Sequence, residues 1–263
     1  SNDTGNDIVI GHSGSDTFIG DIKDLSVTEM SGEWLDSTNN SLSVTITAGD
    51  DILAGNTGND TLIGDVETAE AIARVDSWVN ADATANVTIT GGDDTLVGGS
   101  GDDILIGDVK YLIETETDNS GRWGDGVPEA NVTVIGGDDI LIGGSGNDTM
   151  TGDVLNAGTG TVVGGEDTFV FSVASDFGDD TITDFEVGKD VLHFHDVVDI
   201  GSDGVDIADL EAITTVVDNG TDVVVTFGGT AAGASITFSG IGGHSYDSID
   251  DLVNSDPSKI IID

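Results

Sequence analysis

The sequence contains no cysteine, and only 6 of its 263 residues are lysine or arginine. Against these stand 51 aspartates and glutamates, which give a formal net charge of −45. This imbalance argues against nucleic acid and anionic membrane surfaces as partners, because both attract positively charged proteins. The lack of cysteine excludes disulfide bonds, so a secreted chain of this composition needs another kind of cross-link, and metal ions are the obvious substitute.

Long hydrophobic runs are also missing. No segment is long enough to insert in a membrane, and the first residues show no signal peptide. Those residues already lie within a repeat, so we expect the chain to be the C-terminal part of a longer protein. So high a charge usually indicates disorder, yet 37% of the residues are apolar and fall in short β-branched runs. Such a chain is expected to collapse only when cations bind to it.

A nine-residue repeat organises what is present. Residues 91–108, GGDDTLVGGSGDDILIGD, are two nonapeptides in tandem, each with a glycine-rich turn, an aspartate and a short apolar strand. Several further copies share this register, and the residue two places after the aspartate is apolar in all of them, which predicts a strand with one inward side chain. The aspartates at the sixth position are Asp7, Asp16, Asp51, Asp60, Asp94, Asp103, Asp139, Asp148 and Asp167.

Longer segments interrupt the repeat at regular intervals. The chain leaves the pattern after Gly-Asp pairs at 20–21, 64–65, 107–108 and 152–153, and successive restarts are 43 to 45 residues apart. Because these excursions follow the same turn of every coil, we expect them to leave from one edge of the stack and to pair as β-hairpins. Propensity alone favours a helix over residues 67–75, but the need to stack favours strands.

The pattern degenerates from about residue 169, which divides the chain in two. Residues 1–170 form the repeat region, with long insertions at 22–48, 66–91 and 109–136 and a short one at 154–163, and residues 171–263 form a terminal region. In the terminal region we predict a short helix at 207–214, a hairpin of strands 222–227 and 234–239, a helix at 249–254 capped by Ser248, and a last strand at 260–262. A non-repetitive end of this kind shields the open edge of a solenoid.

The motif G-G-x-G-x-D-x-U-x, repeated in phase, resembles the RTX (repeats-in-toxin) family of secreted calcium-binding modules. The resemblance implies an all-β fold: a right-handed parallel β-roll solenoid with the hairpin insertions on one edge and a C-terminal cap. It implies a bacterial protein that a type I secretion apparatus exports, so that it is extracellular or lies at the cell surface. It also implies several bound Ca²⁺ ions, each shared by stacked turns.

Calcium takes six to eight oxygen ligands, which aspartates and glycine-rich backbone supply together. The resemblance implies one column of ligands on the uninterrupted edge, Asp16, Asp60, Asp103 and Asp148, and another on the excursion edge, Asp7, Asp51, Asp94, Asp139 and Asp167. Asp180 and Asp190 are candidates to extend the columns. The turn glycines of these sites are Gly11, Gly14, Gly55, Gly58, Gly98, Gly101, Gly143 and Gly146. Asp21, Asp65, Asp108 and Asp153 are either further ligands or simple turn residues, and the sequence does not decide between the two.

Without cations, carboxylates stacked at coil spacing repel one another. The core offers little compensation, because each strand buries one side chain worth about 1.5–3 kcal/mol, and ordering nine residues costs several times that. The sequence therefore predicts a chain that is largely disordered without calcium and folded with it.

We expect no enzymatic activity. Catalytic motifs are missing, and acidic pairs are too common for any one to indicate a glycosidase. His193 and His195 share one face of a strand, but two ligands do not make a metal site, so a structural role is the favoured interpretation.

Two other functions stay open. One is a surface-layer, adhesin or filament protein that forms homo-oligomers through outward apolar residues such as Ile8, Ile10, Ile52, Ile140 and Ile142, unless the excursions cover them. The other is a module that binds a surface glycan through one tryptophan in each long excursion, Trp34, Trp78 and Trp123. A hydrophobic seam between the excursions is the favoured interpretation of these tryptophans.

Overall fold

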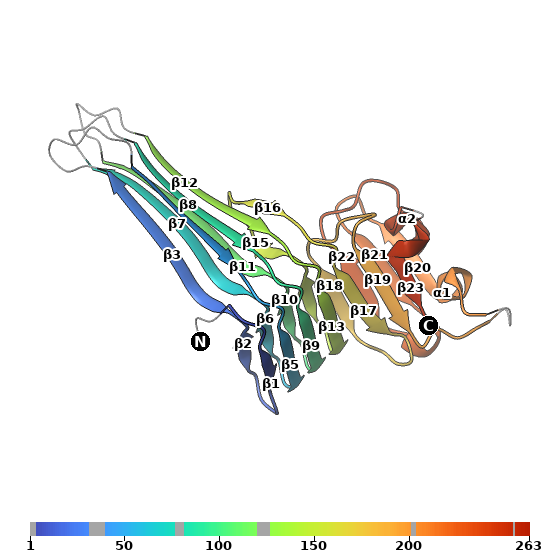
Figure 1. Ribbon diagram of the computed structural model, residues 1–263. Coiled ribbons are helices and arrows are strands. Elements are labelled where there is room, and N and C mark those ends of the chain that lie inside the picture. Colours follow the sequence, from blue (N-terminus) through green and yellow to red (C-terminus); the bar gives the residue numbers. More distant parts are fainter. Residues whose placement is uncertain (1–3, 32–39, 77–81, 120–126, 201–203, 255) are drawn as a thin grey trace.

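A computed structural model describes residues 4–31, 40–76, 82–119, 127–200, 204–254 and 256–263. The repeat region is a stack of coils, and each of the first four coils contributes one strand to each of four sheets. Two of these sheets carry the nonapeptide strands, and we call them the roll. The other two carry the excursions and extend to one side of the roll as an arm (Figure 1).

The nonapeptide strands pair in parallel with their copies in the next coil. Leu53, Leu96 and Leu141 are aligned across three coils and are fully buried. The first roll sheet consists of β1 (Ile8–Ile10), β5 (Ile52–Thr57), β9 (Thr95–Ser100), β13 (Ile140–Ser145), β17 (Thr168–Ser172), β19 (Val191–His195) and β23 (Ile260–Ile262). The second consists of β2 (Thr17–Ile19), β6 (Thr61–Ile63), β10 (Ile104–Ile106), β14 (Thr149–Thr151), β18 (Asp179–Ile182), β22 (Ser235–Phe238), β21 (Val223–Phe227) and β20 (Thr214–Asp218).

The excursions are not hairpins, which corrects the sequence prediction. Their outgoing strands form one parallel sheet of β3 (Ile22–Ser31), β7 (Val66–Asp76), β11 (Val109–Asn119) and β15 (Val154–Asn156). Their returning strands form another, of β4 (Asn40–Thr47), β8 (Ala83–Thr90), β12 (Pro128–Ile135) and β16 (Thr161–Val163). Because the excursions are nearly equal in length, corresponding backbone groups lie beside one another in successive coils. Each strand therefore pairs with its copy in the next coil rather than with the returning strand of its own excursion. Residues 67–75 are strand, as the need to stack predicts.

The arm has a hydrophobic core of its own between its two sheets. It contains small side chains such as Ala69, Ala71 and Ala85, which are fully buried, together with Val87 and Val132. Because this core lies within the arm, the excursions are a continuation of each coil and not loops laid against the roll.

Two glutamates protect the last long edge of the arm. The fourth excursion is short, so β16 pairs only with Thr133–Ile135 of β12. The backbone N–H groups of Val132 and Ala130 instead donate to the carboxylates of Glu114 and Glu116, at 2.7 and 3.2 Å. Inward charged side chains at a sheet edge satisfy its donors and discourage further pairing.

The terminal region closes the roll with the elements that the sequence predicts. α1 spans Ile207–Ile213, and β21 and β22 form an antiparallel pair. α2 is shorter than predicted, at Ile249–Leu252, and Ser248 caps it by accepting from the N–H of Asp251 at 3.1 Å. A 3₁₀ turn at Pro257–Lys259 then leads into β23. No helix within the described ranges has both the length and the apolar character needed to cross a membrane.

Candidate metal centre

The turns between the two roll sheets depend on glycine. Gly58, Gly101 and Gly146 have φ values of 131°, 129° and 125°, which side chains other than that of glycine rarely tolerate. A Cβ atom at Gly101 would lie 2.0 Å from the carbonyl oxygen of Gly58 in the preceding coil. Conformation and the close approach of successive coils therefore both require glycine here.

A row of aspartates, which we call the outer ladder, runs along these turns. The backbone N–H of each donates to Oδ1 of the next, at distances of 2.7 to 2.9 Å. Its members are Asp16, Asp60, Asp103, Asp148 and Asp180. The hydrogen bonds align the carboxylates in one column, as the spacing indicates, and use only one oxygen of each.

A second row lies where the arm joins the roll, a region that we call the waist. Here too each N–H donates to the next Oδ1, at 2.5 to 3.2 Å. The members of this waist ladder are Asp7, Asp51, Asp94, Asp139, Asp167 and Asp190. Asp51, Asp94 and Asp139 are at most 1% exposed, whereas Asp7 lies in the first coil and is half-buried. Both columns thus have the predicted members, and Asp180 and Asp190 extend one each.

The aspartates at which the chain leaves the second roll sheet also lie at the waist. We call Asp21, Asp65, Asp108 and Asp153 the exit aspartates, and their exposure is at most 5%. Each accepts a hydrogen bond from the returning chain of its own coil: from the N–H groups of Gly49, Gly92, Gly137 and Gly165, at 2.6 to 3.2 Å. They therefore bond across the waist to chain 12 to 29 residues away.

Many of these carboxylates keep one oxygen in an unsatisfied, buried position. Among the described residues, Oδ2 of Asp51, Asp60, Asp94, Asp103, Asp139 and Asp148 has no hydrogen-bond partner. The same holds for Oδ1 of Asp65 and Oδ2 of Asp108. A buried charged oxygen without a partner is costly, so the arrangement requires a proton or a cation at these positions.

The space beside these oxygens suits calcium. A Cβ atom at Gly107 would lie 1.8 Å from Asp139 Oδ2 and 2.1 Å from the carbonyl oxygen of Gly152. At the outer turns, a Cβ atom at Gly98 would lie 2.4 Å from Asp103 Oδ2 and 2.6 Å from the carbonyl oxygen of Gly143. A carboxylate and a carbonyl oxygen therefore converge on one point at both edges. Calcium prefers such all-oxygen ligand sets, with about 2.3–2.6 Å between ion and oxygen, so these residues fit it.

Burial changes the acidity of both ladders. It raises the pKa of Asp94 and of Asp180 to about 8, that of Asp167 to about 9 and that of Asp148 to about 6. Charged neighbours contribute, such as Asp51 beside Asp94. Burial also raises the pKa of Asp139 well above its ordinary value, and Asp108 adds to that shift. At pH 7, carboxyl groups with pKa values of about 8 to 9 are mostly charged in the folded chain only if a cation compensates them.

Gly107→Ala tests whether the space beside Asp139 holds an ion. The added methyl group would occupy the point on which Asp139 Oδ2 and the Gly152 carbonyl converge. We expect the variant to bind at least one calcium ion fewer than the wild type, measured by equilibrium dialysis at a calcium concentration where both are folded. Gly228→Ala is the control, because its Cβ atom would lie 3.4 Å from its nearest contact, the carbonyl oxygen of Ile213. An unchanged ion count in Gly107→Ala would exclude an ion at this point.

A different group of polar side chains meets near the end of the chain. Among the described residues, His193, His195 and Asp263 bring ligand atoms within 4.8 Å of one another. His195 Nδ1 lies 2.5 Å from Asp263 Oδ1, and these contacts lower the pKa of Asp263. The sequence did not indicate Asp263, because only the pairing of β19 with β23 brings it to the histidines. The contacts join β23 to β19, which agrees with the structural role predicted for the histidines.

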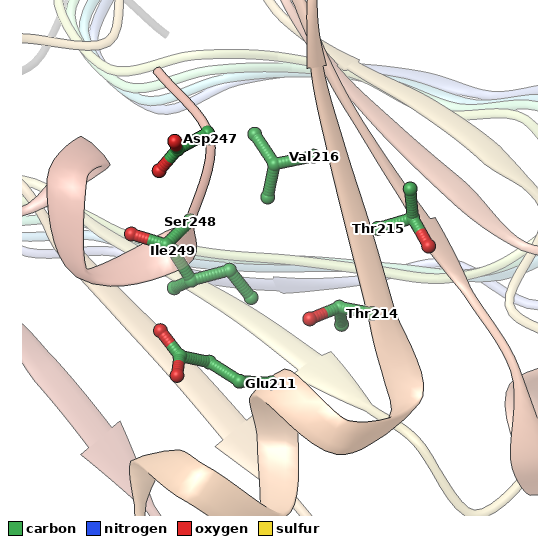
Figure 2. A pocket seen from close by; sticks show the side chains of 7 residues that line it. All are labelled: Glu211, Thr214, Thr215, Val216, Asp247, Ser248 and Ile249. Carbon is green, nitrogen blue, oxygen red and sulfur yellow. The ribbon is translucent and has the colours of Figure 1, made fainter.

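The terminal region also contains a cavity of about 290 Å³ beside β20 and the start of α2 (Figure 2). Its lining residues are Glu211, Thr214, Thr215, Val216, Asp247, Ser248 and Ile249. All of them belong to the terminal region, and Ser248 is already the cap of α2. The cavity is therefore separate from the aspartate ladders.

Two of the sequence interpretations concern the surface. Ile8, Ile52 and Ile140 are 69%, 46% and 40% exposed, so the arm does not cover these outward positions. Trp34, Trp78 and Trp123 lie outside the described residues, and the interpretations that depend on them stay predictions.

Comparison with protein-family models finds the RTX calcium-binding nonapeptide repeat in four copies, at residues 3–22, 45–66, 88–109 and 136–156. No curated protein sequence matches the chain. Among solved structures, the extracellular lipase LipA from Serratia marcescens is similar, with 17% identity and a TM-score of 0.34. The alignment covers 96% of this chain but only 40% of the lipase, and so low a score indicates nothing about activity. The four copies lie in the parallel roll, so this chain contains a stacked array of RTX calcium-binding nonapeptide repeats.

Proposed function

We propose that this chain is a non-enzymatic module that folds on binding calcium outside the cell and thereby supports export by a type I secretion apparatus. The observation that carries the proposal is the set of buried aspartate oxygens that have no partner among the described residues. RTX nonapeptide repeats bind calcium, and proteins that contain them are typically secreted. Extracellular calcium modules bind in the 10⁻⁴–10⁻³ M range, so a chain of this kind stays unfolded in the cytosol, where calcium is scarce.

The fold explains how calcium would act. Each carboxylate in a ladder lies directly beside that of the next coil, so like charges repel along the whole stack. An ion between two coils changes this repulsion into attraction and supplies the missing partner for the second oxygen. Because each ion joins two coils, binding at one level orders the ligands of the next, and we expect folding to be cooperative along the stack.

A calcium titration followed by far-UV circular dichroism tests the proposal. We expect β structure to form with a midpoint of about 10⁻⁴–10⁻³ M, as in other extracellular calcium modules. Magnesium at equal ionic strength is the control, because it screens charge equally but dehydrates reluctantly and demands octahedral geometry. Equal folding in magnesium would show that screening, not coordination, drives folding. A midpoint near or below about 10⁻⁷ M, in the range of cytosolic calcium sensors and buffers, would contradict folding outside the cell.

A further inference from the structure

The exit aspartates Asp65 and Asp108 occupy a position at which the nonapeptide motif has glycine. In the uninterrupted turns the strand is followed by two glycines, as at 98–99 and 143–144, whereas the exits read Gly64-Asp65 and Gly107-Asp108. Both side chains are 0% exposed. A carboxylate therefore replaces glycine at the point where the chain turns from the roll into the arm, and it does so in a fully buried place.

Their contacts leave each of these carboxylates half satisfied. Asp65 Oδ2 accepts from the N–H of Gly92 at 3.2 Å, and Asp108 Oδ1 accepts from the N–H of Gly137 at 3.1 Å. The two residues are neighbours in successive coils, where the backbone N–H of Asp65 donates to the carbonyl oxygen of Asp108 at 3.3 Å. Burial raises the pKa of Asp108, and the charge of Asp65 adds to that shift. Neither Asp65 Oδ1 nor Asp108 Oδ2 has a donor among the described residues. Two buried acids side by side repel each other when both are charged, so the pair needs a proton or a cation.

The neighbouring waist ladder increases this need. Asp94 and Asp139 each keep a buried Oδ2 without a partner, and their charges act on Asp65. In the described ranges, the ion pairs of lysine and histidine side chains do not reach Asp65, Asp94, Asp108 or Asp139. A single shared proton would neutralise one exit pair but would leave the Oδ2 atoms of the waist ladder unsatisfied.

At the next level of the waist, a lysine lies near the exit aspartate Asp153. There the charge of Lys189 partly opposes the burial that raises the pKa of Asp153. Its Nζ donates to the carbonyl oxygen of Gly164 at 2.7 Å and contacts Glu186. A Cβ atom at Gly164 would lie 2.2 Å from Asp153 Oδ2, so the lysine approaches the exit carboxylate. Where the arm becomes short, the charge of a lysine therefore acts on an exit aspartate.

We propose that Asp65 and Asp108 are ligands of divalent cations in the waist, in addition to the nonapeptide aspartates. The ligand set is carboxylate and carbonyl oxygen only, which suits a hard cation such as calcium. Among the described residues, the one group of three side chains whose potential ligand atoms lie within 4.8 Å of one another is His193, His195 and Asp263. The waist therefore does not bring three side-chain ligands together at one point. Backbone carbonyl groups such as that of Gly107, which a Cβ atom at Gly64 would approach to 2.1 Å, would therefore complete the set.

The inference rests on the proposed calcium-dependent fold, and it is tested with Asp65→Asn, Asp108→Asn and the double variant. Asparagine keeps the shape and the acceptor for the glycine N–H but removes the charge. We expect the double variant to bind fewer calcium ions than the wild type in equilibrium dialysis, to need about tenfold or more calcium to fold, and to melt at lower temperature in saturating calcium. If a shared proton were the only link, the ion count would not change and the melting temperature would stay equal or rise.

The matched control is the double variant Asp93→Asn/Asp138→Asn. These residues lie beside the waist ladder but are exposed, and they accept backbone hydrogen bonds that asparagine also accepts. The control removes the same number of charges and should keep the wild-type ion count.

If only the exit variants failed to fold at any calcium concentration, a shared proton would be excluded, because an asparagine amide can replace the hydrogen bond that a shared proton would make. If the wild type folds on calcium and the exit variants bind as many ions, this inference fails while the proposed function stands. A wild type that does not bind calcium would defeat the proposed function itself.

Discussion

Excess chelator is expected to unfold the repeat region completely, with loss of its β-sheet circular dichroism. The radius of gyration should rise roughly threefold, which is the ratio between an unfolded and a compact chain of this length. The increase should be somewhat smaller than this ratio because the folded chain is elongated. The roll strands of the first four coils each bury at most two apolar side chains fully, such as Leu141 in β13 or Leu105 and Ile106 in β10. Once the ions leave, the ladders contain stacked, buried carboxylates whose mutual repulsion this core does not offset.

Small-angle X-ray scattering and circular dichroism on the same samples measure this change, and re-addition of calcium should reverse it. The control is chelator with calcium in excess over it, which separates removal of the metal from any direct effect of the chelator. The arm has its own apolar core, so it is the part most able to resist. A compact chain with an unchanged β spectrum in chelator would show that the ladders are stable without metal, and the proposed function would fail.

Acid is expected to replace calcium in part. The pKa of Asp94 and of Asp180 is raised to about 8 and that of Asp167 to about 9 in the folded chain, mainly by burial, against an ordinary value of 3.8. A raised pKa means that the folded chain binds more protons than the unfolded chain between these values. The stabilisation is therefore fully present below about pH 4, declines as the pH rises above that value and is lost once the pH passes about 8 to 9. The metal-free chain should gain β structure and compactness between pH 8 and pH 4.5.

The same linkage predicts that protons and calcium compete. In the pH range where the metal-free chain has gained β structure, calcium binding should release protons, and the apparent affinity for calcium should increase as the pH rises within that range. Isothermal titration calorimetry in two buffers of different ionisation enthalpy measures the number of protons released. A calcium affinity that is constant where circular dichroism shows the metal-free chain to be folded, together with no proton release, would show that the ladder carboxyl groups are already ionised in the metal-free fold.

The difference between prediction and structure is clearest in the arm. The sequence indicated that the excursions stack on one edge, because they recur at the same turn of each coil. It did not indicate their pairing, since a segment such as residues 66–76 suits a hairpin strand and a parallel strand equally. The parallel register, for example Val44 beside Val87 and Val87 beside Val132, joins residues 43 and 45 positions apart, and only the stacking of whole coils creates those neighbours.

The aspartates show the same division within the candidate site. The sequence by itself determined both ladders, because a strict period places each Asp beside its copy in the next coil. The turns and the alternation of side chains depend on interactions over only a few residues, so the sequence pattern predicts them too. For the exit aspartates the sequence left two interpretations open, further ligands or simple turn residues. Only the tertiary structure decided that Asp65 and Asp108 are buried together and bonded to the returning chain, because burial and charge proximity depend on segments that meet only after the coil has closed.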